Sequence, residues 1–313
     1  DLDTQSAAYL FSIAEEEGML PTGAIKQIDI IAKGEKTDEG IGLDHGGVLG
    51  IQFSNNDKKV SLDHHQPWKA PHTSATKQVF NLFEKTGIFT EEVFNKHPYL
   101  KDLKNFVTIV DNFEHVTPPR GEKAFSFEDI TQKYPNSLGA VYSHLPFGTV
   151  LKFIKEGKKP WTQFTEADLK QKISGKFAQE EDPENPGKYR FQKDEHGKLI
   201  PVTLKDIVEK TRVNVFNGLE KLKKRQQEND TAGIAQTTPE MGKVFFDVTR
   251  EDGKGHVVLS NELSRMSGYD TFFQWNEQTQ SFFVSSKKDL KGVFNKIKES
   301  TPGAKLVRGE MIV

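Results

Sequence analysis

Asp63, His64 and His65 form the most distinctive chemical motif of the chain, a carboxylate followed by two adjacent imidazoles. Carboxylates and imidazoles are the ligands that hard or borderline divalent ions such as Mg²⁺, Mn²⁺ and Zn²⁺ accept in proteins. One His of such a pair can bind a metal while the other faces a substrate phosphate. Two neighbouring histidines are equally consistent with solvated loop residues, so the motif gains weight only in combination with others.

Further acidic residues recur in the same half of the chain. Asp1 and Asp3 lie two residues apart, so at a strand end or tight turn both carboxylates can face one pocket. Asp44 precedes a His and two glycines, and glycine lets a backbone approach a ligand closely. Asp111 follows the apolar run FVTIV. Taken singly, each of these residues is also consistent with a polar turn.

Strand-like runs precede most of these residues, which predicts an α/β domain with a largely parallel sheet. In such sheets ligands bind beyond the carboxyl ends of the strands, where Asp44, Asp63 and Asp111 are expected. Helices are predicted from residue 7 to 17 and from Ser74 to Lys85, the second with Ser74 as its N-cap and Gly87 beyond its end. Strands are predicted at 27–31, 48–53, 59–62 and 106–110.

The remainder of the chain predicts a helical connector and a smaller α+β domain. Domain boundaries are placed at 1–150, 151–235 and 236–313. Thr165 and Asp168 have the spacing of a capping box, within a helical segment that extends to about residue 173. The polar stretch 179–200 predicts a surface insertion with a hairpin, and 226–242 predicts a linker. Strand-like runs and one helix then follow to the C-terminus.

Composition narrows the classes of function. The chain has 313 residues, 35% apolar and 28% charged, with a formal net charge of −2. That balance argues against a protein that coats duplex DNA by bulk charge. The absence of Cys excludes disulfides, thiolate metal sites and a Cys nucleophile. No apolar run approaches the roughly 18 residues of a membrane helix, and no basic secretory start is present. We therefore expect a cytoplasmic protein without membrane contacts.

Read in order, the motifs resemble the DHH (RecJ-like) phosphoesterase superfamily. The chain gives DLDTQSAAYLF, then LDHGG, then LDHHQPW with the Ser-Ala-Thr helix start, then FVTIVDN. The family carries a His-x-x-x-Asp-x-Asp motif before a helix of small residues, then an Asp, then Asp-His-His, then a further Asp. Its first His corresponds to a position four residues before Asp1. The resemblance covers about residues 1 to 150.

The resemblance implies a site with two divalent ions, Mn²⁺ or Mg²⁺. Asp44 would bridge the ions and act in catalysis, and His65 would contact the scissile phosphate. Asp3, His64 and Asp111 would complete one ion's site, and Asp1 would serve the other. With only Asp1 and the bridging Asp44, the second ion has few ligands unless the upstream His is present.

The C-terminal residues resemble the family's substrate-binding domain more faintly. The run SFFVSSKKDLKGVFNKIKES is similar to that domain's strand, its turn with Ser and basic residues, and its following helix. The family's glycine-rich segment has no counterpart here. The resemblance implies five phosphate contacts: Ser285, Ser286, Lys287, Lys288 and Arg308. Lys287 and Lys288 are also consistent with solvated charges at the start of a helix.

These observations predict a metal-dependent phosphoesterase that hydrolyses phosphodiester bonds of short oligonucleotides or nucleotides. A pyrophosphatase or polyphosphatase would use the same chemistry, with more cationic side chains in its cleft. A catalytically weak RecJ-like protein that binds nucleic acid or a protein complex is the third alternative. Metal content distinguishes an enzyme from a binding protein, and a panel of substrates separates the two enzymes.

Overall fold

The computed structural model describes most of the chain as helices, strands and ordered turns. The described residues are 1–21, 23, 40–43, 50–53, 59–63, 73–112, 114–116, 125–231, 237–248, 266–276, 281–286, 291–300, 305–307 and 310–312. They group into two compact units, one formed by Asp1–Ser126 with Asn217–Val313 and the other by Phe127–Phe216. The predicted boundaries after residues 150 and 235 remain predictions.

A small mixed sheet lies in the N-terminal part of the first unit. Strand β3 (Lys59–Asp63) is central, pairing in parallel with β1 (Gly40–Leu43) and antiparallel with β2 (Gly50–Phe53). The predicted strand 59–62 is therefore present as β3, and the predicted strand 48–53 is present from residue 50 onward as β2. The predicted strand 27–31 lies outside the described residues, so the prediction of a largely parallel sheet stays open.

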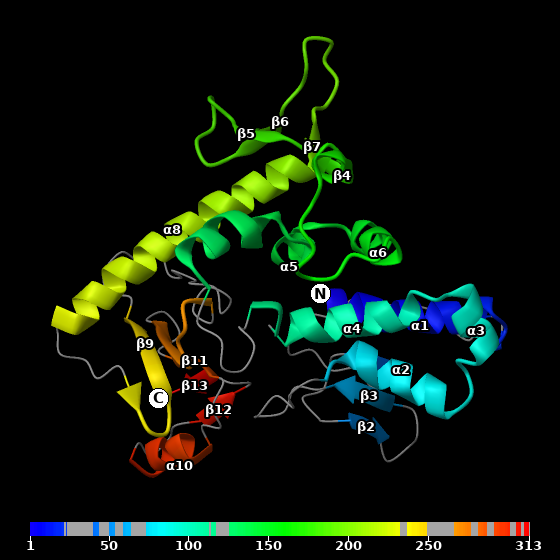
Figure 1. The fold of residues 1–313 in the computed structure, drawn as a ribbon, viewed down its shortest axis with the longest axis horizontal. Helices are drawn as coiled ribbons and strands as arrows, with labels where there is room; N and C mark the ends of the chain where they lie inside the picture. Colours follow the sequence, from blue (N-terminus) through cyan, green and yellow to red (C-terminus); the bar gives the residue numbers. More distant parts are fainter. Residues whose placement is uncertain are drawn as a thin grey trace. The chain divides into compact units, whose positions relative to one another are not determined.

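Three helices, α1 (Leu2–Glu16), α2 (Ala75–Lys85) and α4 (Leu100–Asp111), pack on one another beside this sheet (Figure 1). Helix α1 also contacts β1, and α2 contacts β3. The short helices α3 (Glu91–Lys96) and η1 (Glu114–Val116) flank α4. The helices bury the following apolar side chains: Leu10, Ile13, Val79, Phe80, Phe83, Leu103, Phe106, Val107 and Val110. Their burial fixes the positions of the three helix ends.

The predicted strand 106–110 is wrong, because these residues belong to helix α4. The buried positions Leu100, Leu103, Phe106, Val107 and Val110 recur every three or four residues, which is the period of a helix face. The β-branched run FVTIV favours a strand when it is read as five residues alone. Over twelve residues, the helical period decides the structure. Asp111 therefore ends a helix and not a strand.

Helix α2 confirms both predicted boundary signals, and its end gives a stability prediction. The Ser74 side chain accepts the Lys77 N–H at 3.1 Å, and Gly87 has φ +74°. A side chain in this left-handed region costs about 1–2 kcal/mol. We expect Gly87→Ala to lower the free energy of unfolding by about 1 kcal/mol. Gly148→Ala should raise it by about 0.5–1 kcal/mol, because Gly148 is exposed in a helix and its added Cβ meets nothing within 4 Å.

Urea unfolding of the two glycine variants beside the parent checks these opposite signs. A Gly87→Ala variant as stable as the parent would show that the turn after α2 tolerates a side chain.

The second unit combines short helices with small antiparallel hairpins. Strand β4 (Lys172–Phe177) pairs antiparallel with β7 (Pro201–Thr203). Strand β5 (Gln179–Glu181) pairs antiparallel with β6 (Tyr189–Phe191), which confirms the predicted hairpin within 179–200. Helix α7 ends at Leu169 and β4 follows, so the predicted continuation of this helix to residue 173 is wrong. The elements in chain order are η2 (Asp129–Lys133), η3 (Tyr134–Asn136), α5 (Leu138–Val141), η4 (Tyr142–His144), α6 (Phe147–Lys155), α7 (Glu166–Leu169), β4 (Lys172–Phe177), β5 (Gln179–Glu181), β6 (Tyr189–Phe191) and β7 (Pro201–Thr203).

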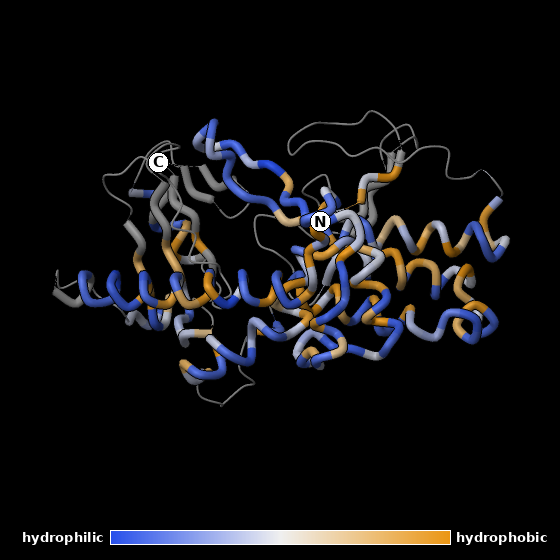
Figure 2. Tube along the Cα trace, turned by 90° about the horizontal axis from the view of Figure 1, so that it is seen from above, coloured by the Kyte–Doolittle hydropathy of each residue, from blue (hydrophilic) through white to orange (hydrophobic). Residues whose placement is uncertain are grey.

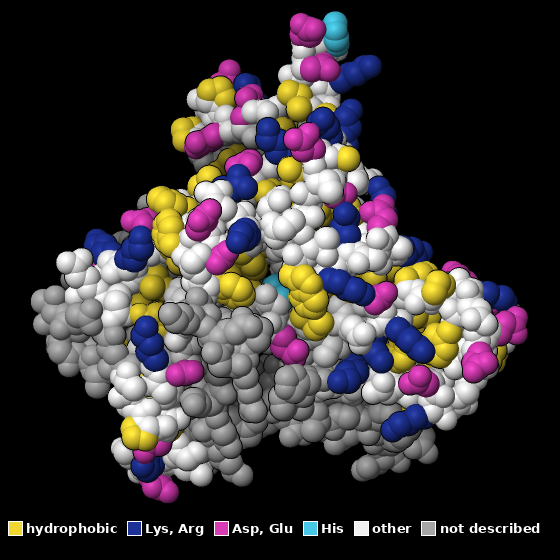
Figure 3. Space-filling view, in the orientation of Figure 1, with side chains coloured by type: hydrophobic (Ala, Val, Ile, Leu, Met, Phe, Trp, Pro, Cys, Tyr) yellow, Lys and Arg dark blue, Asp and Glu magenta, His cyan; other side chains and the backbone are white. Residues whose placement is uncertain are grey.

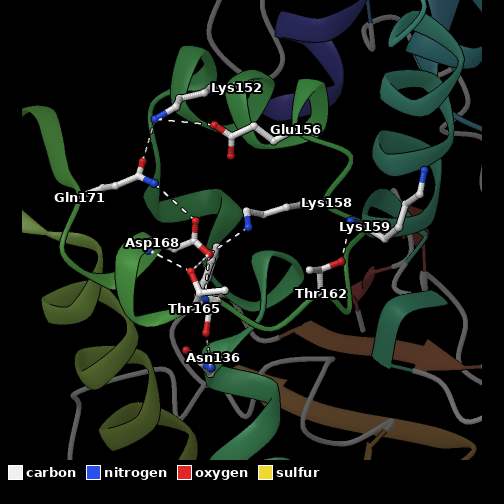
Figure 4. Close-up of polar contacts among 10 residues, drawn as sticks. Asn136, Lys152, Glu156, Lys158, Lys159, Thr162, Thr165, Asp168 and Gln171 are labelled. Carbon is white, nitrogen blue, oxygen red and sulfur yellow. Dashed lines mark hydrogen bonds and ion pairs between the residues drawn. The ribbon is translucent and has the colours of Figure 1, made fainter.

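A buried ion pair holds the start of α7 (Figure 4). The predicted capping box is confirmed: Asp168 Oδ2 accepts the Thr165 N–H and hydroxyl, both at 2.8 Å, and Thr165 Oγ1 accepts the Asp168 N–H at 3.2 Å. Lys158 Nζ donates to the same Oδ2 at 2.9 Å. Burial raises the pKa of Asp168, but the hydrogen bonds from Thr165 and Lys158 outweigh it, so the net pKa lies below the usual value.

Removing the Lys158 ammonium group should lower the free energy of unfolding. The Lys158 and Asp168 side chains are 14% and 9% exposed. Among the described residues, Lys158→Met would leave the buried carboxylate with the contacts to Thr165 and Gln171 alone. We expect a loss of about 1–3 kcal/mol at pH 7. The matched variant Lys152→Met, whose lysine is 55% exposed, should lose at most about 1 kcal/mol.

The pH dependence of unfolding separates this ion pair from simple packing. Because the folded pKa of Asp168 is depressed, its contribution to stability is present above the unfolded-state pKa of about 3.9 and is lost as pH falls through the folded value. The parent should therefore lose more stability than Lys158→Met between about pH 5 and pH 2. Parallel curves for the two proteins would contradict the assignment.

Helix α8 (Leu204–Thr231) is shared between the two units. Figure 2 shows it as mainly hydrophilic with hydrophobic residues recurring along it. It contains the first part of the predicted linker 226–242, so that part of the prediction is wrong. Two strands, β8 (Thr237–Thr238) and β9 (Gly242–Val248), come next among the described residues. Within the described ranges, no helix combines the length and apolar character that crossing a bilayer requires.

The described C-terminal residues form a mixed sheet and a helix. Six strands are ordered β12-β13-β11-β10-β9-β8, with β9 and β10 parallel and the other pairs antiparallel. Stacked Phe245 and Phe272 rings lie in its core. The remaining elements are β10 (Thr271–Asn276), β11 (Ser281–Ser286), α10 (Lys291–Ser300), β12 (Lys305–Val307) and β13 (Glu310–Ile312).

Candidate metal site

The carboxylate of Asp3 joins the start of α1 to the start of α2. Its two oxygens accept the backbone N–H groups of Ala75 at 2.7 Å and Thr76 at 2.8 Å, and the Thr76 hydroxyl donates to the Asp3 carbonyl at 2.9 Å. Asp3 is 2% exposed. The free N–H groups at a helix start carry partial positive charge, which attracts an anion. Asp3 is thus held in a defined, buried position.

The C-terminal end of α4 is bonded to the residues at the start of α2. Asn112 Nδ2 donates to the Thr73 carbonyl at 2.8 Å, and the Ser74 and Thr108 hydroxyls are 3.2 Å apart. These bonds fix the C-terminus of α4, which carries Asp111, beside the N-terminus of α2. Asp3 binds the same N-terminus of α2. The helix start that carries Asp3 and the helix end that carries Asp111 are therefore both bonded to the first turn of α2 or the residues just before it.

The sheet directs two more motifs to neighbouring strand ends. In the parallel pair β1–β3, Leu43 is opposite Leu62. The next residues along the chain are Asp44 and Asp63, and Asp63 is followed by His64 and His65. Parallel strands end at the same edge of a sheet, so the register brings the start of both motifs to one edge. Asp44, His64 and His65 themselves lie outside the described residues.

The remaining predicted metal ligands occupy different surroundings. Asp1 is exposed and is the N-cap of α1, its Oδ1 accepting the Thr4 N–H at 2.9 Å and the Thr4 hydroxyl at 3.0 Å. Asp1 and Asp3 therefore lie at a helix start, not at a strand end, and only Asp3 is buried. Asp111 is half-buried at the last position of α4. Among the described side chains, no three His, Asp or Glu come close enough together to hold a metal ion.

Of the five predicted phosphate contacts, the structure describes the side chain of Ser286 alone. Its hydroxyl lies 2.7 Å from the Thr271 hydroxyl and donates to the Asp270 carbonyl at 3.3 Å, within the C-terminal sheet. Ser285 lies in β11, and its side chain is outside the described set, as are Lys287, Lys288 and Arg308. Their contact with phosphate stays a prediction.

Sequence reasoning missed the residues that assemble the helix ends. Thr76, Thr108 and Asn112 each form a hydrogen bond that joins the start of α1 or the end of α4 to the start of α2, but none of them was predicted to be a ligand. The sequence predicts one part of this arrangement. Ser74 marks the start of a helix, and the free N–H groups at a helix start need hydrogen-bond acceptors. That the acceptor is Asp3, more than seventy residues earlier in the chain, is a tertiary contact that no local pattern contains.

The side chains of Asp3 and Asp111 are carboxylates, which are ligands that a hard divalent ion accepts. A carboxylate has about four lone-pair sites, so two N–H bonds do not exhaust Asp3 as a ligand. Comparison with models of known protein families, with curated proteins and with solved structures gave no match.

Proposed function

We propose that this protein is a metal-dependent phosphoesterase of the DHH (RecJ-like) type, which hydrolyses phosphodiester bonds in short oligonucleotides or nucleotides. The observation that carries the proposal is the junction at the start of α2, where Asp3 is bonded to Ala75 and Thr76 and Asn112 is bonded to Thr73. These contacts join the helix that carries Asp3 and the helix that carries Asp111, which are about a hundred residues apart in the chain, to one turn of α2.

Each acidic motif is proposed to supply ligands to one or both metal ions. Asp3, Asp44, His64 and Asp111 would hold one Mn²⁺ or Mg²⁺ ion, and Asp1 with Asp44 would hold a second. Such a pair of ions, when bound, stabilises charge on the attacking and leaving oxygens of a phosphoryl transfer. The contribution of the protein is to keep the ligands in place before substrate arrives, and the two N–H bonds to Asp3 do this for the first motif.

His65 is proposed to contact the scissile phosphate directly. An imidazole beside a metal ligand can donate a hydrogen bond to a phosphate oxygen, or transfer a proton to a leaving oxygen, depending on its protonation state. Its neighbour His64 precedes it by one residue, so in an extended chain the two rings would point in different directions. One ring is then available for the metal and the other for the substrate.

A panel of substrates tests this function. The protein, with any residues that precede Asp1 retained, is incubated with Mn²⁺, with Mg²⁺ or with a chelator. Substrates are a labelled oligonucleotide, a dinucleotide, a cyclic dinucleotide, pyrophosphate and inorganic polyphosphate. We expect Mn²⁺-dependent release of mononucleotides and none with chelator. Release of phosphate from polyphosphate alone would replace this function by that of a polyphosphatase, and no turnover of any substrate would favour the binding protein.

A further inference from the structure

Two hairpins of the second unit carry a concentration of exposed apolar side chains. Strands β5 and β6 form the first hairpin, and a bridge between Lys193 and Leu199 closes the second. Figure 1 labels β5 and β6, and the same region of Figure 3 shows hydrophobic side chains beside basic and acidic ones. Of the large apolar side chains that are exposed in the described part of the chain, five belong to these hairpins and the residues beside them: Phe177, Tyr189, Phe191, Leu199 and Ile200.

Three aromatic side chains of this group lie together. Tyr189 and Phe191 are two residues apart in β6, so their side chains point to the same side of the strand. The Phe177 ring lies 6.1 Å from the Phe191 ring in an edge-to-face arrangement. The exposed fractions are 38% for Phe177, 69% for Tyr189 and 50% for Phe191. We call these three side chains the aromatic face. Single exposed apolar residues are common, whereas a group of exposed rings is typical of an interaction site.

The outer edge of β6 offers backbone groups for hydrogen bonding. In an antiparallel pair, positions alternate between residues that are bonded to the neighbouring strand and residues whose backbone groups point away from it. Gln192 donates its N–H to the Ala178 carbonyl at 2.9 Å, and the register of β5 with β6 continues from there without a shift. The N–H and C=O groups of Phe191 and Tyr189 therefore point away from β5. We call this row of groups the free edge of β6.

The two strands of the first hairpin carry opposite charges. Glu180 and Glu181 lie in β5, whereas Arg190 lies in β6 and Lys188 directly precedes it. Glu180 accepts a hydrogen bond from Arg190 Nε at 2.8 Å, and Glu181 accepts the Gly187 N–H at 2.8 Å. Lys188 is exposed and forms no ion pair with a residue that the structure describes. The free edge thus belongs to the cationic strand, and both carboxylates belong to the other strand.

A second lysine lies at the opposite end of the free edge. Lys193 is exposed, two residues after Phe191, and it likewise has no ion-pair partner among the described residues. The other carboxylates of the two hairpins belong to their turns. Asp182 and Asp194 accept backbone N–H groups of their own turns, and Glu184 and Glu195 are exposed there. A cation therefore flanks each end of the free edge.

These charges favour a particular kind of partner strand. Antiparallel pairing of two copies of the chain through Tyr189 and Phe191 would place Arg190 opposite Arg190 of the other copy, and like charges directly opposite destabilise a strand pair. A partner strand with an acidic residue opposite Arg190 would gain an attractive pair instead. The residues on either side of that acidic residue would lie over the aromatic face, because side chains alternate along a strand. Apolar side chains suit those positions.

We propose that the free edge of β6 binds an extended segment of a partner protein in which apolar and acidic residues alternate. The segment would add a strand to the hairpin, with main-chain hydrogen bonds to Tyr189 and Phe191. In this mode of recognition, the main chain supplies affinity and the alternate side chains supply specificity. Apolar side chains would contact the aromatic face, and acidic ones would lie near Arg190 and Lys188. The inference goes beyond the proposed function and does not depend on metal binding.

Titration of the full chain with a synthetic peptide tests the proposal. The probe is labelled Val-Glu-Val-Glu-Val-Glu-Val, its control is labelled Val-Lys-Val-Lys-Val-Lys-Val, and fluorescence anisotropy gives both affinities. We expect the acidic peptide to bind about tenfold more tightly than the basic one. Amide hydrogen exchange followed by NMR locates the site. The Tyr189 and Phe191 amides should exchange more slowly in the complex, and the Arg190 amide, which points toward β5, should change little.

Charge reversal tests the choice of partner without disturbing the fold. The variant Lys188→Glu/Lys193→Glu should bind the acidic peptide about tenfold more weakly and the basic peptide more tightly, because two exposed charges change sign. The matched reversal Lys205→Glu/Lys210→Glu, at exposed positions of α8, should bind both peptides like the parent.

A second pair of variants tests the main-chain hydrogen bonds. Tyr189→Thr removes a ring of the aromatic face and keeps the outward N–H, whereas Tyr189→Pro removes both. Proline is compatible with an edge position whose N–H faces solvent, so the bonds to β5 should remain. We expect Tyr189→Pro to bind the acidic peptide more weakly than Tyr189→Thr, and equal affinities would contradict strand addition.

Four other results would overturn the proposal. The first is a parent that binds neither peptide or binds both equally, and the second is binding of the acidic peptide that survives reversal of Lys188 and Lys193. The third is dimerisation of the parent that Tyr189→Pro abolishes, which would assign the free edge to a second copy of the chain. The fourth is binding of a twelve-nucleotide oligothymidylate that Lys188→Glu/Lys193→Glu abolishes while the acidic peptide does not bind, which would assign the hairpin to nucleic acid.

Discussion

Replacing Asp3 with Ala is expected to lower the free energy of unfolding by about 2–5 kcal/mol. The carboxylate accepts the N–H groups of Ala75 and Thr76, and both of these residues are completely buried. Each buried donor left without an acceptor costs about 1–3 kcal/mol. The loss is predicted from described contacts and does not depend on whether a metal binds. Urea unfolding in the presence of a chelator measures it.

Two matched variants serve as controls for the loss of stability in Asp3→Ala. Asp1→Ala removes a carboxylate two residues away that is exposed and caps the start of α1, so it should cost only about 1 kcal/mol. Asp3→Asn keeps one oxygen acceptor and should fall between the two. If Asp3→Ala is no less stable than Asp1→Ala, the bond between α1 and α2 is not the support that we infer.

The second large effect concerns Asp44 and His65, which the proposed function assigns to different tasks. Asp44→Ala should abolish binding of both ions and hydrolysis together, because a bridging carboxylate serves both. His65→Ala should keep its metal and lose about 10²–10⁴ in rate, which is the usual contribution of a positioned acid or base. Metal content after dialysis and the rate of oligonucleotide cleavage with Mn²⁺ are measured for both variants and the parent.

A His65→Ala variant that loses metal as completely as Asp44→Ala would reverse the roles given to the two histidines. His45→Ala is a useful control, since it is adjacent to Asp44 in the chain and has no assigned ligand role. It should retain both metal and most of the rate.

Local signals were predicted well where short-range hydrogen bonds decide the structure. The Ser74 cap, the Gly87 turn and the pairing of Thr165 with Asp168 are all present, because each involves residues within a few positions of one another. The strand at residues 59–62 was also predicted, and with it the position of Asp63 at a strand end.

Predictions failed where tertiary packing decides. The run FVTIV has the composition of a strand, but burial of one helical face against α1 and α2 makes it the end of α4. The spacing of Asp1 and Asp3 suggested two carboxylates directed at one pocket, whereas the helix start exposes the first and buries the second. The partner of Asp3 at Ala75 depends on the whole arrangement of helices, which residue spacing alone does not encode.

Manganese binding by the protein is the most direct measurement of the central claim. Equilibrium dialysis followed by metal analysis gives the number of ions per chain, with any residues before Asp1 retained and Asp44→Ala measured in parallel. We expect two Mn²⁺ ions per parent chain and fewer than one in the variant. A parent that binds no Mn²⁺, or binds as much after Asp44→Ala as before, would contradict it.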